Sequence, residues 1–322
     1  MMLKVENLTI DFRKHSAYKR AIHSLSFTIN EGEILGIVGE SGSGKSIVNY
    51  AIMGLLPDDA KVNADSLLFN GRSLLSLTSS EIRSIRGKQV AMIFQDPMSA
   101  LNPCFSIEYQ LIETLREHYS GLSKSDYRQE ALKLLIQVGI NEAEARLKSY
   151  PHELSGGMAQ RVMIAMALAC KPKLLIADEP TTALDVTIQA QILALLKTCC
   201  KELNMAMILV SHDIEVVRSM ADRIQVMYSG EIVEQGTTED VLSQPLHPYT
   251  QGLIRSIPVK KRSSPAQRLE AIKGGIIPVD KVVVGCRFAS RCPSRHELCD
   301  VKPVLRASQS GVNVRCHLGA NL

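Results

Sequence analysis

One stretch near the N-terminus has the residue types that hold a phosphate group. Residues 39–46 fit the pattern G-x-x-x-x-G-K-[ST], with Gly39, Ser41, Gly42, Ser43 and Gly44 ahead of Lys45 and Ser46. Backbone N–H groups of such a loop converge on phosphate oxygens, and the following helix adds the positive end of its dipole. We expect Lys45 to neutralise the β- and γ-phosphates and the Ser46 hydroxyl to bind Mg²⁺.

A second candidate element is an apolar segment that ends in two acids. Residues 174–177 are apolar and lead directly into Asp178 and Glu179. Asp178 is predicted to hold the Mg²⁺ shell, and Glu179 to polarise the attacking water as a general base. Apolar strands with terminal acids are common, but one that follows a phosphate loop indicates a nucleotidase.

A third element narrows the class of nucleotidase. Residues 154–160, LSGGMAQ, precede the two acids and open a predicted helix. They resemble the signature loop of ABC-type ATPases. Gln95 is similar to that family's Q-loop glutamine, residues 183–185 (Ala183, Leu184, Asp185) to its D-loop, and His212 to its switch histidine. Five elements in family order leave chance negligible.

The resemblance implies a nucleotide site that two subunits share. Ser155, Gly156 and Gly157 would offer hydroxyl and backbone donors to the partner's γ-phosphate. His212 would contact the γ-phosphate on its own side, and Asp185 would help to join the two sites.

The resemblance also gives roles to residues outside the loops. Gln95 would join Ser46 and Asp178 at Mg²⁺, and would act with Glu179 and His212 in ATP hydrolysis. An aromatic residue near the N-terminus stacks on adenine in this family. Phe12 fits by spacing, and Tyr18 in the same connection is the alternative.

The elements between these motifs predict an α/β fold. Its core is expected to be a P-loop NTPase (RecA-like) domain with an N-terminal antiparallel β subdomain, an inserted helical subdomain and a small C-terminal cysteine-containing appendage. The short, wholly apolar run 34–38 suits a strand that is buried on both faces. We expect the nucleotide-binding domain over residues 1–245, its helical insert at about 97–153 and the appendage over 246–322. Strands are predicted at 3–12, 21–29, 34–38, 90–94, 173–177, 205–210, 224–228 and 231–235, and helices at 44–55, within 106–145, at 186–203 and at 214–220.

A closer resemblance covers nearly the whole chain. Residues 95–103, 177–187 and 247–250 (His-Pro-Tyr-Thr) are similar to the dipeptide/oligopeptide and nickel importer branch of the family. Residues 156–161 and 163–167 resemble the first of that branch's two paralogous ATPases. The resemblance implies a paralogous ATPase partner, two membrane permease subunits and, indirectly, a substrate-binding protein. It also implies a peripheral place at the cytoplasmic face of the inner or plasma membrane. Di- or oligopeptide import is expected, with nickel or antimicrobial-peptide uptake as alternatives.

The chain contains eight cysteines, and four of them crowd its last 40 residues. Disulfides are rare in a reducing cytoplasm, so this group predicts metal or cluster binding. The group resembles a [4Fe–4S] site found in some members of the branch, and its wide spacing favours iron–sulfur over Zn²⁺. Zn²⁺ and plain thiols remain alternatives. Arg287, Arg291 and Arg315 flank three of the cysteines and could offset the charge of a cluster. The four expected ligands are Cys286, Cys292, Cys299 and Cys316.

Charge and motif content argue against a nucleic-acid-binding protein, a soluble ABC ATPase and a redox protein. The formal net charge is +4 over 322 residues and no dense basic stripe is present, so we expect no nucleic-acid partner. A soluble ABC ATPase acting on DNA or the ribosome is the less favoured alternative. Such proteins usually have two nucleotide-binding halves in one chain or a long coiled coil, whereas this sequence has one phosphate loop and neither addition. A cluster-binding redox protein would leave the ATPase motifs unexplained.

No apolar run reaches the ~18 residues that cross a bilayer, and the N-terminus does not resemble a signal peptide.

Overall fold

The computed structural model describes residues 1–182, 184–257 and 272–318, which form two compact units. Unit 1 contains Met1–Ile29, Ile34–Leu75 and the described residues from Ser211 onwards, and unit 2 contains Asn30–Glu33 and Ser76–Val210. The predicted domain boundary at residues 245 and 246 stays a prediction. Ala183, the first residue of the predicted D-loop, lies outside the described residues.

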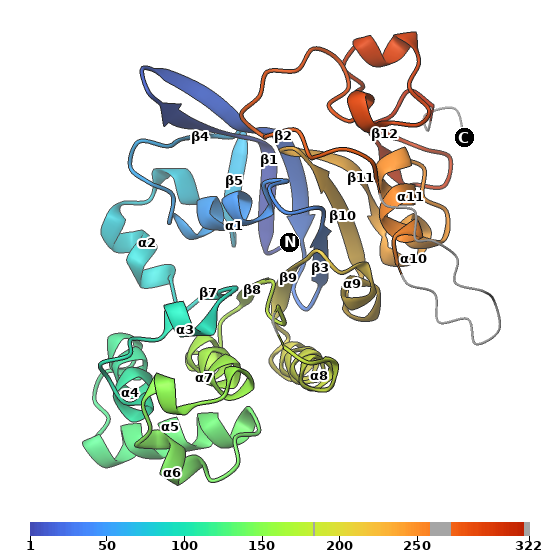
Figure 1. The fold of residues 1–322 in the computed structure, drawn as a ribbon. Helices are drawn as coiled ribbons and strands as arrows, with labels where there is room; N and C mark the ends of the chain where they lie inside the picture. Colours follow the sequence, from blue (N-terminus) through green and yellow to red (C-terminus); the bar gives the residue numbers. More distant parts are fainter. Residues whose placement is uncertain (183, 258–271, 319–322) are drawn as a thin grey trace, which may run out of the picture. The chain divides into compact units, whose positions relative to one another are not determined.

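The N-terminal part of unit 1 is an antiparallel sheet, blue to cyan in Figure 1. Its strands lie in the order β2-β1-β5-β6, and β4 also pairs with β1. Leu3, Val5, Leu8 and Ile10 of β1 are fully buried. The predicted antiparallel subdomain is confirmed. The strands are β1 (Leu3–Lys14), β2 (Ala17–Ile29), β4 (Lys61–Asn63), β5 (Ser66–Phe69) and β6 (Arg72–Ser73).

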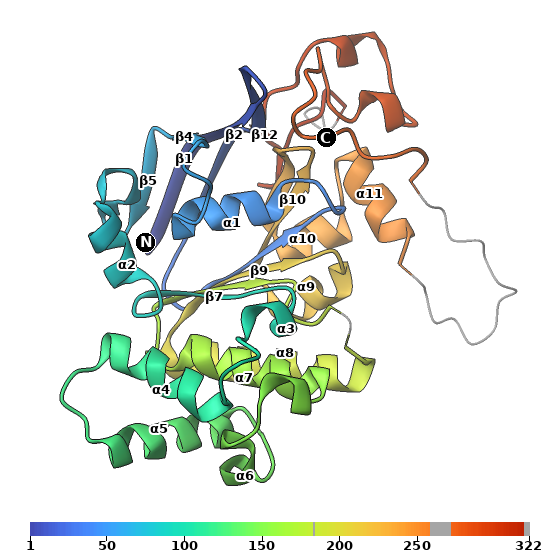
Figure 2. The same ribbon diagram turned by 60° about the vertical axis from the view of Figure 1, so that its left-hand side comes forward.

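A second group of strands in unit 1 carries the phosphate loop and the C-terminal segment. The buried strand β3 (Ile34–Val38) pairs in parallel with β10 (Arg223–Tyr228), which forms the predicted hairpin with β11 (Glu231–Thr237). Strand β13 (Asn313–Val314) pairs with β11 and with β12 (Arg306–Ala307), so strand pairing ties the C-terminal segment to the core. Figure 2 shows this red segment near α11. The helices of unit 1 are α1 (Lys45–Met53), α9 (Ile214–Met220), α10 (Thr238–Ser243) and α11 (Pro248–Arg255), with short 3-10 helices at Leu74–Ser76, Ala289–Arg291 and Glu297–Asp300.

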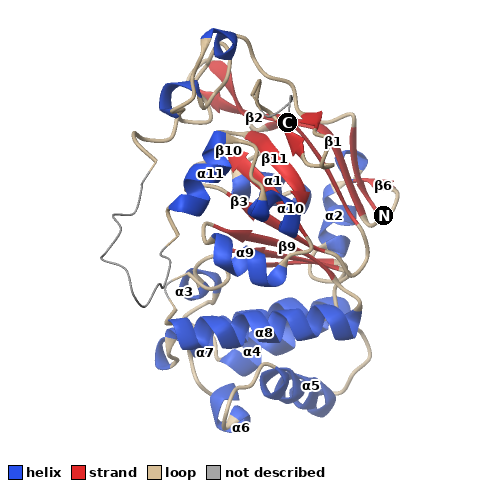
Figure 3. Cartoon of the chain, turned by 90° about the vertical axis from the view of Figure 1, so that its right-hand side faces the viewer, coloured by secondary structure: helices blue, strands red, loops and turns tan. Residues whose placement is uncertain are grey.

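Unit 2 contains three parallel strands and the helical insert. Strand β8 (Leu174–Asp178) lies between β7 (Val90–Ile93) and β9 (Ala206–Ser211), and all three are buried along their length, as strands covered on both faces are. Helices α4, α5 and α6 pack on one another, and α4 and α5 also pack on α7 (Figure 3). The predicted helical insert is confirmed. The helices are α2 (Ser79–Ile85), α3 (Pro97–Ala100), α4 (Ile107–His118), α5 (Lys124–Gln137), α6 (Ala143–Leu147), α7 (Gly156–Leu168) and α8 (Val186–Leu203), with a 3-10 turn at Pro151–Glu153.

Short polar residues set the starts of several helices. Ser106, Ser123 and Ser155 each accept a backbone N–H of the first turn of α4, α5 and α7, and Ser123 forms a capping box with Asp126. Asp185 caps α8 in the same way. Among the described residues, no helix is both long enough and apolar enough to span a membrane.

Candidate nucleotide-binding site

The phosphate loop connects β3 to α1 in a shape that glycine permits. A side chain at Gly39 would place its Cβ 2.2 Å from the carbonyl oxygen of Met227, which is far inside van der Waals contact. Gly44 has a left-handed backbone (φ 101°) as the N-cap of α1, and no side chain caps that helix. A helix start without a side-chain cap directs backbone N–H groups towards an anion.

The lysine of this loop is buried within it. Lys45 is 5% exposed, and its Nζ donates to the carbonyl oxygens of Gly39 at 2.7 Å and Glu40 at 3.0 Å. The ammonium group therefore lies inside the loop, where the pattern predicts the charge that meets the phosphates. Ser46 is half-buried in the first turn of α1.

The acid motif stands at the carboxyl end of β8. Asp178 is the last residue of the strand and is buried, and Glu179 follows it with a left-handed backbone (φ 50°). This backbone is strained for a residue other than glycine, and such strain gathers at functional sites. The N–H of Glu179 donates to the carbonyl of Val210 at 2.9 Å, which holds the turn in place.

Two side chains fix the carboxylate of Glu179. Its Oε2 accepts hydrogen bonds from Nε2 of Gln95 at 3.1 Å and from Oγ1 of Thr182 at 2.9 Å. The structure thus brings together the predicted base and the predicted Q-loop glutamine from positions far apart in sequence. Sequence reasoning missed Thr182, although a hydroxyl three residues after an acid was an available signal.

The Mg²⁺ ligand set stays a prediction. Ser46 belongs to unit 1, whereas Asp178 and Gln95 belong to unit 2. A hydroxyl, a carboxylate and an amide oxygen are the hard oxygen donors that Mg²⁺ prefers, so the chemistry of the predicted set suits this ion.

The signature loop forms an exposed helix start. Ser155 caps α7 by accepting the N–H of Met158 at 3.3 Å, and Gly156 is exposed with nothing within 4 Å of where its Cβ would lie. Gly157 packs against Ile188 of α8, where a Cβ would be 3.1 Å from the Ile188 methyl. Asp185 accepts the N–H groups of Thr187 and Ile188, so this predicted subunit-joining residue also caps α8.

His212 is exposed in the turn between β9 and α9, in unit 1. The neighbouring Ser211 hydroxyl accepts the N–H of Asp213 at 2.9 Å, which shapes the turn that presents the imidazole. Its contact with a γ-phosphate stays a prediction.

The two candidate adenine-stacking residues occupy opposite faces of one hairpin. Phe12 pairs with Lys19 and Arg13 pairs with Tyr18, and side chains on successive rows of a sheet point to opposite faces. At most one of Phe12 and Tyr18 can therefore face a given nucleotide. The ammonium of Lys61 lies 3.8 Å from the centre of the Tyr18 ring and covers one of its faces. Phe12 stays the prediction.

The four C-terminal cysteines line one cavity together with His247, His296 and His317. The N–H of Cys286 donates to the carbonyl of Cys299 at 2.8 Å. Burial raises the pKa of Cys286 to about 11, with smaller contributions from the other three thiols, and burial also raises the pKa of Cys292.

A tight turn brings two of these cysteines together. Gly285 has φ 82°, and a Cβ there would lie 2.4 Å from the Cys299 carbonyl oxygen, so the turn requires glycine.

The same cysteines do not form a ready metal site. Within the part of the chain that the structure describes, no group of three or more His, Cys, Asp or Glu residues is placed to hold a metal ion. The flanking arginines also point elsewhere. Arg287 donates to the hydroxyl of Ser229, Arg291 to the carboxylate of Glu40, and Arg315 to the carbonyl of Ile232. Of the other four cysteines, Cys104 is exposed, and Cys170, Cys199 and Cys200 are buried.

Comparison with known proteins agrees with these features. The family model "ABC transporter" matches residues 22–182, and the model "Oligopeptide/dipeptide transporter, C-terminal region" matches residues 233–299. The dipeptide transport ATP-binding protein DppD of Escherichia coli (strain K12) is 46% identical over 317 residues, which cover 98% of this chain and 96% of that protein. The oligopeptide transport ATP-binding protein AppD of Bacillus subtilis (strain 168) is 47% identical over 319 residues, with 98% and 96% covered.

Solved structures show the same fold. A dimeric bacterial ABC transporter cassette superimposes with a TM-score of 0.65 and 29% identity over 74% of this chain and 99% of that one. A post-hydrolysis dimer of an ATP-binding cassette with ADP and Pi gives 0.64 and 30% over the same shares. The chain therefore belongs to the ATP-binding subunits of the ABC transporter family, in its dipeptide/oligopeptide branch.

Proposed function

We propose that this chain hydrolyses ATP to power an importer of di- or oligopeptides. The observation that carries the proposal is the carboxylate of Glu179, which Gln95 and Thr182 hold at the end of a buried strand. A carboxylate fixed in this way can orient a water molecule and accept its proton as that water attacks the γ-phosphate. ADP and inorganic phosphate are the products.

Mg²⁺ would supply charge neutralisation for the phosphates, held by Ser46, Asp178 and Gln95. The chain's own groups carry the remaining roles. Lys45 binds the β- and γ-phosphates, and His212 contacts the γ-phosphate. Phe12 stacks on the adenine ring.

The active form is a dimer with a paralogous ATPase subunit. The exposed start of α7 at Ser155 and Gly156 is directed outward with backbone donors, and the two dimeric cassettes that this chain resembles support pairing. In the dimer this helix start would bind the γ-phosphate of the partner's ATP, with Asp185 between the two sites. A monomer should then be a poor ATPase.

Gln95 also gives a route from ATP to a membrane partner. It follows β7 and precedes α3, so it stands where the strands of unit 2 pass into the helical insert. Loss or gain of its contact with Glu179 and the γ-phosphate would move the insert. A short helix of one of the two permease subunits would dock beside the insert. This docking places the chain peripherally at the cytoplasmic face of the membrane and links it indirectly to a substrate-binding protein.

Peptide is the proposed cargo, because relatives that share nearly half of this sequence over almost their whole length are named for dipeptide and oligopeptide transport. The test is to purify the native complex with its binding protein and to identify the bound ligand by mass spectrometry and metal analysis. Bound di- or oligopeptides support the proposal. Bound nickel or an antimicrobial peptide would replace the cargo and leave the ATPase role intact.

The finer proposal for the C-terminal cavity is that Cys286, Cys292, Cys299 and Cys316 hold a [4Fe–4S] cluster, with Zn²⁺ as the alternative. The shared cavity supports convergence of four sulfurs. Because no three of the described His, Cys, Asp and Glu side chains are already placed to hold a metal ion, the ligands would have to move on binding, and the thiols would have to lose their protons. Anaerobic purification with iron, sulfide and zinc analysis is the test. Stoichiometric zinc without sulfide selects Zn²⁺, and neither metal selects plain thiols.

A further inference from the structure

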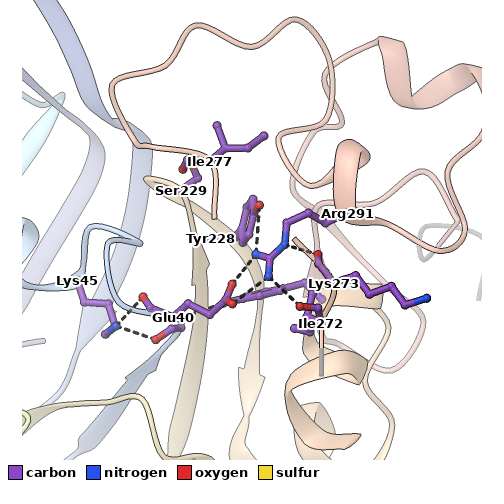
Figure 4. A network of polar contacts seen from close by, with 10 residues as sticks. Glu40, Lys45, Tyr228, Ser229, Ile272, Lys273, Ile277 and Arg291 are labelled. Carbon is purple, nitrogen blue, oxygen red and sulfur yellow. Dashed lines mark hydrogen bonds and ion pairs between the residues drawn. The ribbon is translucent and has the colours of Figure 1, made fainter. Parts of the chain in front are cut away.

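Tyr249 of α11 and Arg291 of the C-terminal segment both contact the phosphate loop at Glu40. The guanidinium of Arg291 donates two hydrogen bonds to the Glu40 carboxylate, from Nη1 at 2.6 Å and from Nη2 at 3.0 Å. The N–H of Glu40 donates to the hydroxyl oxygen of Tyr249 at 2.9 Å. Its carbonyl oxygen accepts from Lys45 at 3.0 Å. The side chain, amide and carbonyl of this loop residue are therefore each engaged, as Figure 4 shows for Arg291 and Lys45.

Arg291 is itself held firmly. Its side chain is 3% exposed, and it donates further hydrogen bonds to the carbonyl oxygens of Lys273 at 3.0 Å and Ile272 at 3.4 Å. The guanidinium lies 5.7 Å from the centre of the Tyr228 ring (Figure 4). The hydrogen bond to Glu40 raises the pKa of Arg291, so the guanidinium stays charged. A bidentate arginine–carboxylate pair in such a setting fixes orientation as well as charge.

Tyr249 is equally constrained. It is 0% exposed and packs edge-on against Tyr228 and at a tilt against Phe288, with ring centres 4.8 and 5.3 Å away. Burial raises its pKa, so the hydroxyl is neutral. It belongs to the His-Pro-Tyr-Thr run of residues 247–250, which the nucleotide chemistry leaves without a role.

A carboxylate in a phosphate-binding loop is electrostatically unfavourable for binding a triphosphate. Glu40 belongs to the phosphate loop itself, three residues before Ser43 and five before Lys45. An unpaired negative charge at Glu40 would therefore repel the incoming phosphates. Pairing with Arg291 offsets that charge. The hydrogen bonds of the Glu40 N–H to Tyr249 and of the Glu40 carbonyl to Lys45 fix the peptide units on either side of Glu40. A loop ordered beforehand loses less entropy when it binds.

We propose that Arg291 and Tyr249 are positioning residues for the phosphate loop. They hold Glu40 so that the loop is ordered and electrically balanced for ATP, and they make ATP affinity depend on the C-terminal segment. Neither residue touches a reacting atom. The inference rests on the proposed assignment of residues 39–46 to ATP.

The test measures the ATP dissociation constant of the full chain by titration calorimetry, and KM and kcat in the assembled transporter. Arg291→Gln should weaken ATP binding about tenfold, equivalent to about 1.4 kcal/mol, and raise KM with little change in kcat at saturating ATP. Arg291→Lys should restore part of the affinity, because a lysine keeps the charge but not the fork. Tyr249→Phe, which keeps the ring in its packed site, should weaken binding a few-fold, because it removes one hydrogen bond to the loop.

A double-mutant cycle separates the pair from general damage. Glu40→Gln removes the carboxylate charge, so adding Arg291→Gln to it should cost clearly less affinity than Arg291→Gln costs alone. Arg295→Gln is the matched control. It removes an arginine from the same segment whose partner is the exposed Asp300, with side chains 55% and 69% exposed, and should leave ATP affinity unchanged.

Three outcomes would contradict the inference, each in a different way. If Arg291→Gln and Tyr249→Phe bind ATP like the original chain while Lys45→Ala does not bind it, the positioning role is wrong and the nucleotide site stands. If Lys45→Ala binds ATP normally, the assignment of the loop itself fails. An additive cycle, with the same cost for Arg291→Gln in both backgrounds, would also overturn the role of the pair.

Discussion

The side-chain amide of Gln95 donates a hydrogen bond of 3.1 Å to the carboxylate of Glu179. Gln95 lies between β7 and α3, and Glu179 lies directly after β8. The bond therefore joins the proposed base to the residue that leads into the helical insert. A change at the γ-phosphate that breaks or remakes this contact would therefore shift the helical insert.

Replacing Glu179 by glutamine should stop turnover without stopping ATP binding. The amide keeps the shape and can still meet Gln95 and Thr182, but it cannot accept a proton from water. We expect kcat of the assembled transporter to fall about 10²–10⁴-fold, with the ATP-bound dimer trapped in a closed state. Phosphate release and gel filtration with ATP provide the measurements. Normal hydrolysis by this variant would rule out Glu179 as the base.

Thr182→Val should slow hydrolysis moderately. Valine has nearly the shape of threonine, so the main change is loss of the 2.9 Å hydrogen bond to Glu179, while Gln95 still holds the carboxylate. We expect kcat to fall about tenfold, equivalent to about 1.4 kcal/mol and within the range of one hydrogen bond, with the ATP dissociation constant unchanged. An unaltered kcat would show that Thr182 does not orient the base.

Gly156→Ala distinguishes a binding role of the signature loop from a folding role. Nothing lies within 4 Å of the added Cβ, and alanine favours helix over glycine by about 1 kcal/mol, so the isolated chain should be as stable or slightly more so. In the assembled transporter the methyl group would intrude on the partner's phosphate, and ATPase activity should drop at least about tenfold. Full activity of the assembled variant would contradict the composite site.

Stability should depend on pH through His247. This imidazole is fully buried at the start of α11, where its Nδ1 accepts the N–H of Tyr249, and burial lowers its pKa from 6.5 to about 3. The unfolded chain takes up a proton below about pH 6.5 and the folded chain does not, so stability falls as the pH drops through that range. Glu234 acts in the opposite sense, because burial raises its pKa and the folded state takes up its proton first.

Comparison with His247→Asn isolates the histidine. Asparagine can still cap the helix but does not titrate. Between about pH 6.5 and about pH 5.5 the variant should gain about 1 kcal/mol relative to the original chain, whatever its offset at neutral pH. Urea unfolding at several pH values measures this gain, and parallel stability curves would contradict it.

Local sequence signals predicted most of the fold. The wholly apolar run at β3 and the apolar residues 174–177 of β8 indicated buried strands, and the glycines and Lys45 between β3 and α1 indicated the phosphate loop. The contacts made by Glu40 were not predictable, because Arg291 and Tyr249 lie more than 200 residues away and no local period connects them. The expectation that Arg291 offsets the charge of a cluster was wrong, because its guanidinium pairs with Glu40. Adjacency to Cys292 in sequence does not fix where the guanidinium points.

The central claim is that ATP hydrolysis by this chain drives peptide import. The direct measurement is uptake of a labelled dipeptide or oligopeptide into proteoliposomes that contain this chain, its paralogue, both permeases and the binding protein. We predict uptake that requires ATP and that falls to background with Lys45→Ala, while the isolated chain hydrolyses ATP poorly. Peptide uptake that persists with Lys45→Ala, or full ATPase activity from the isolated monomer at every concentration, would contradict the account.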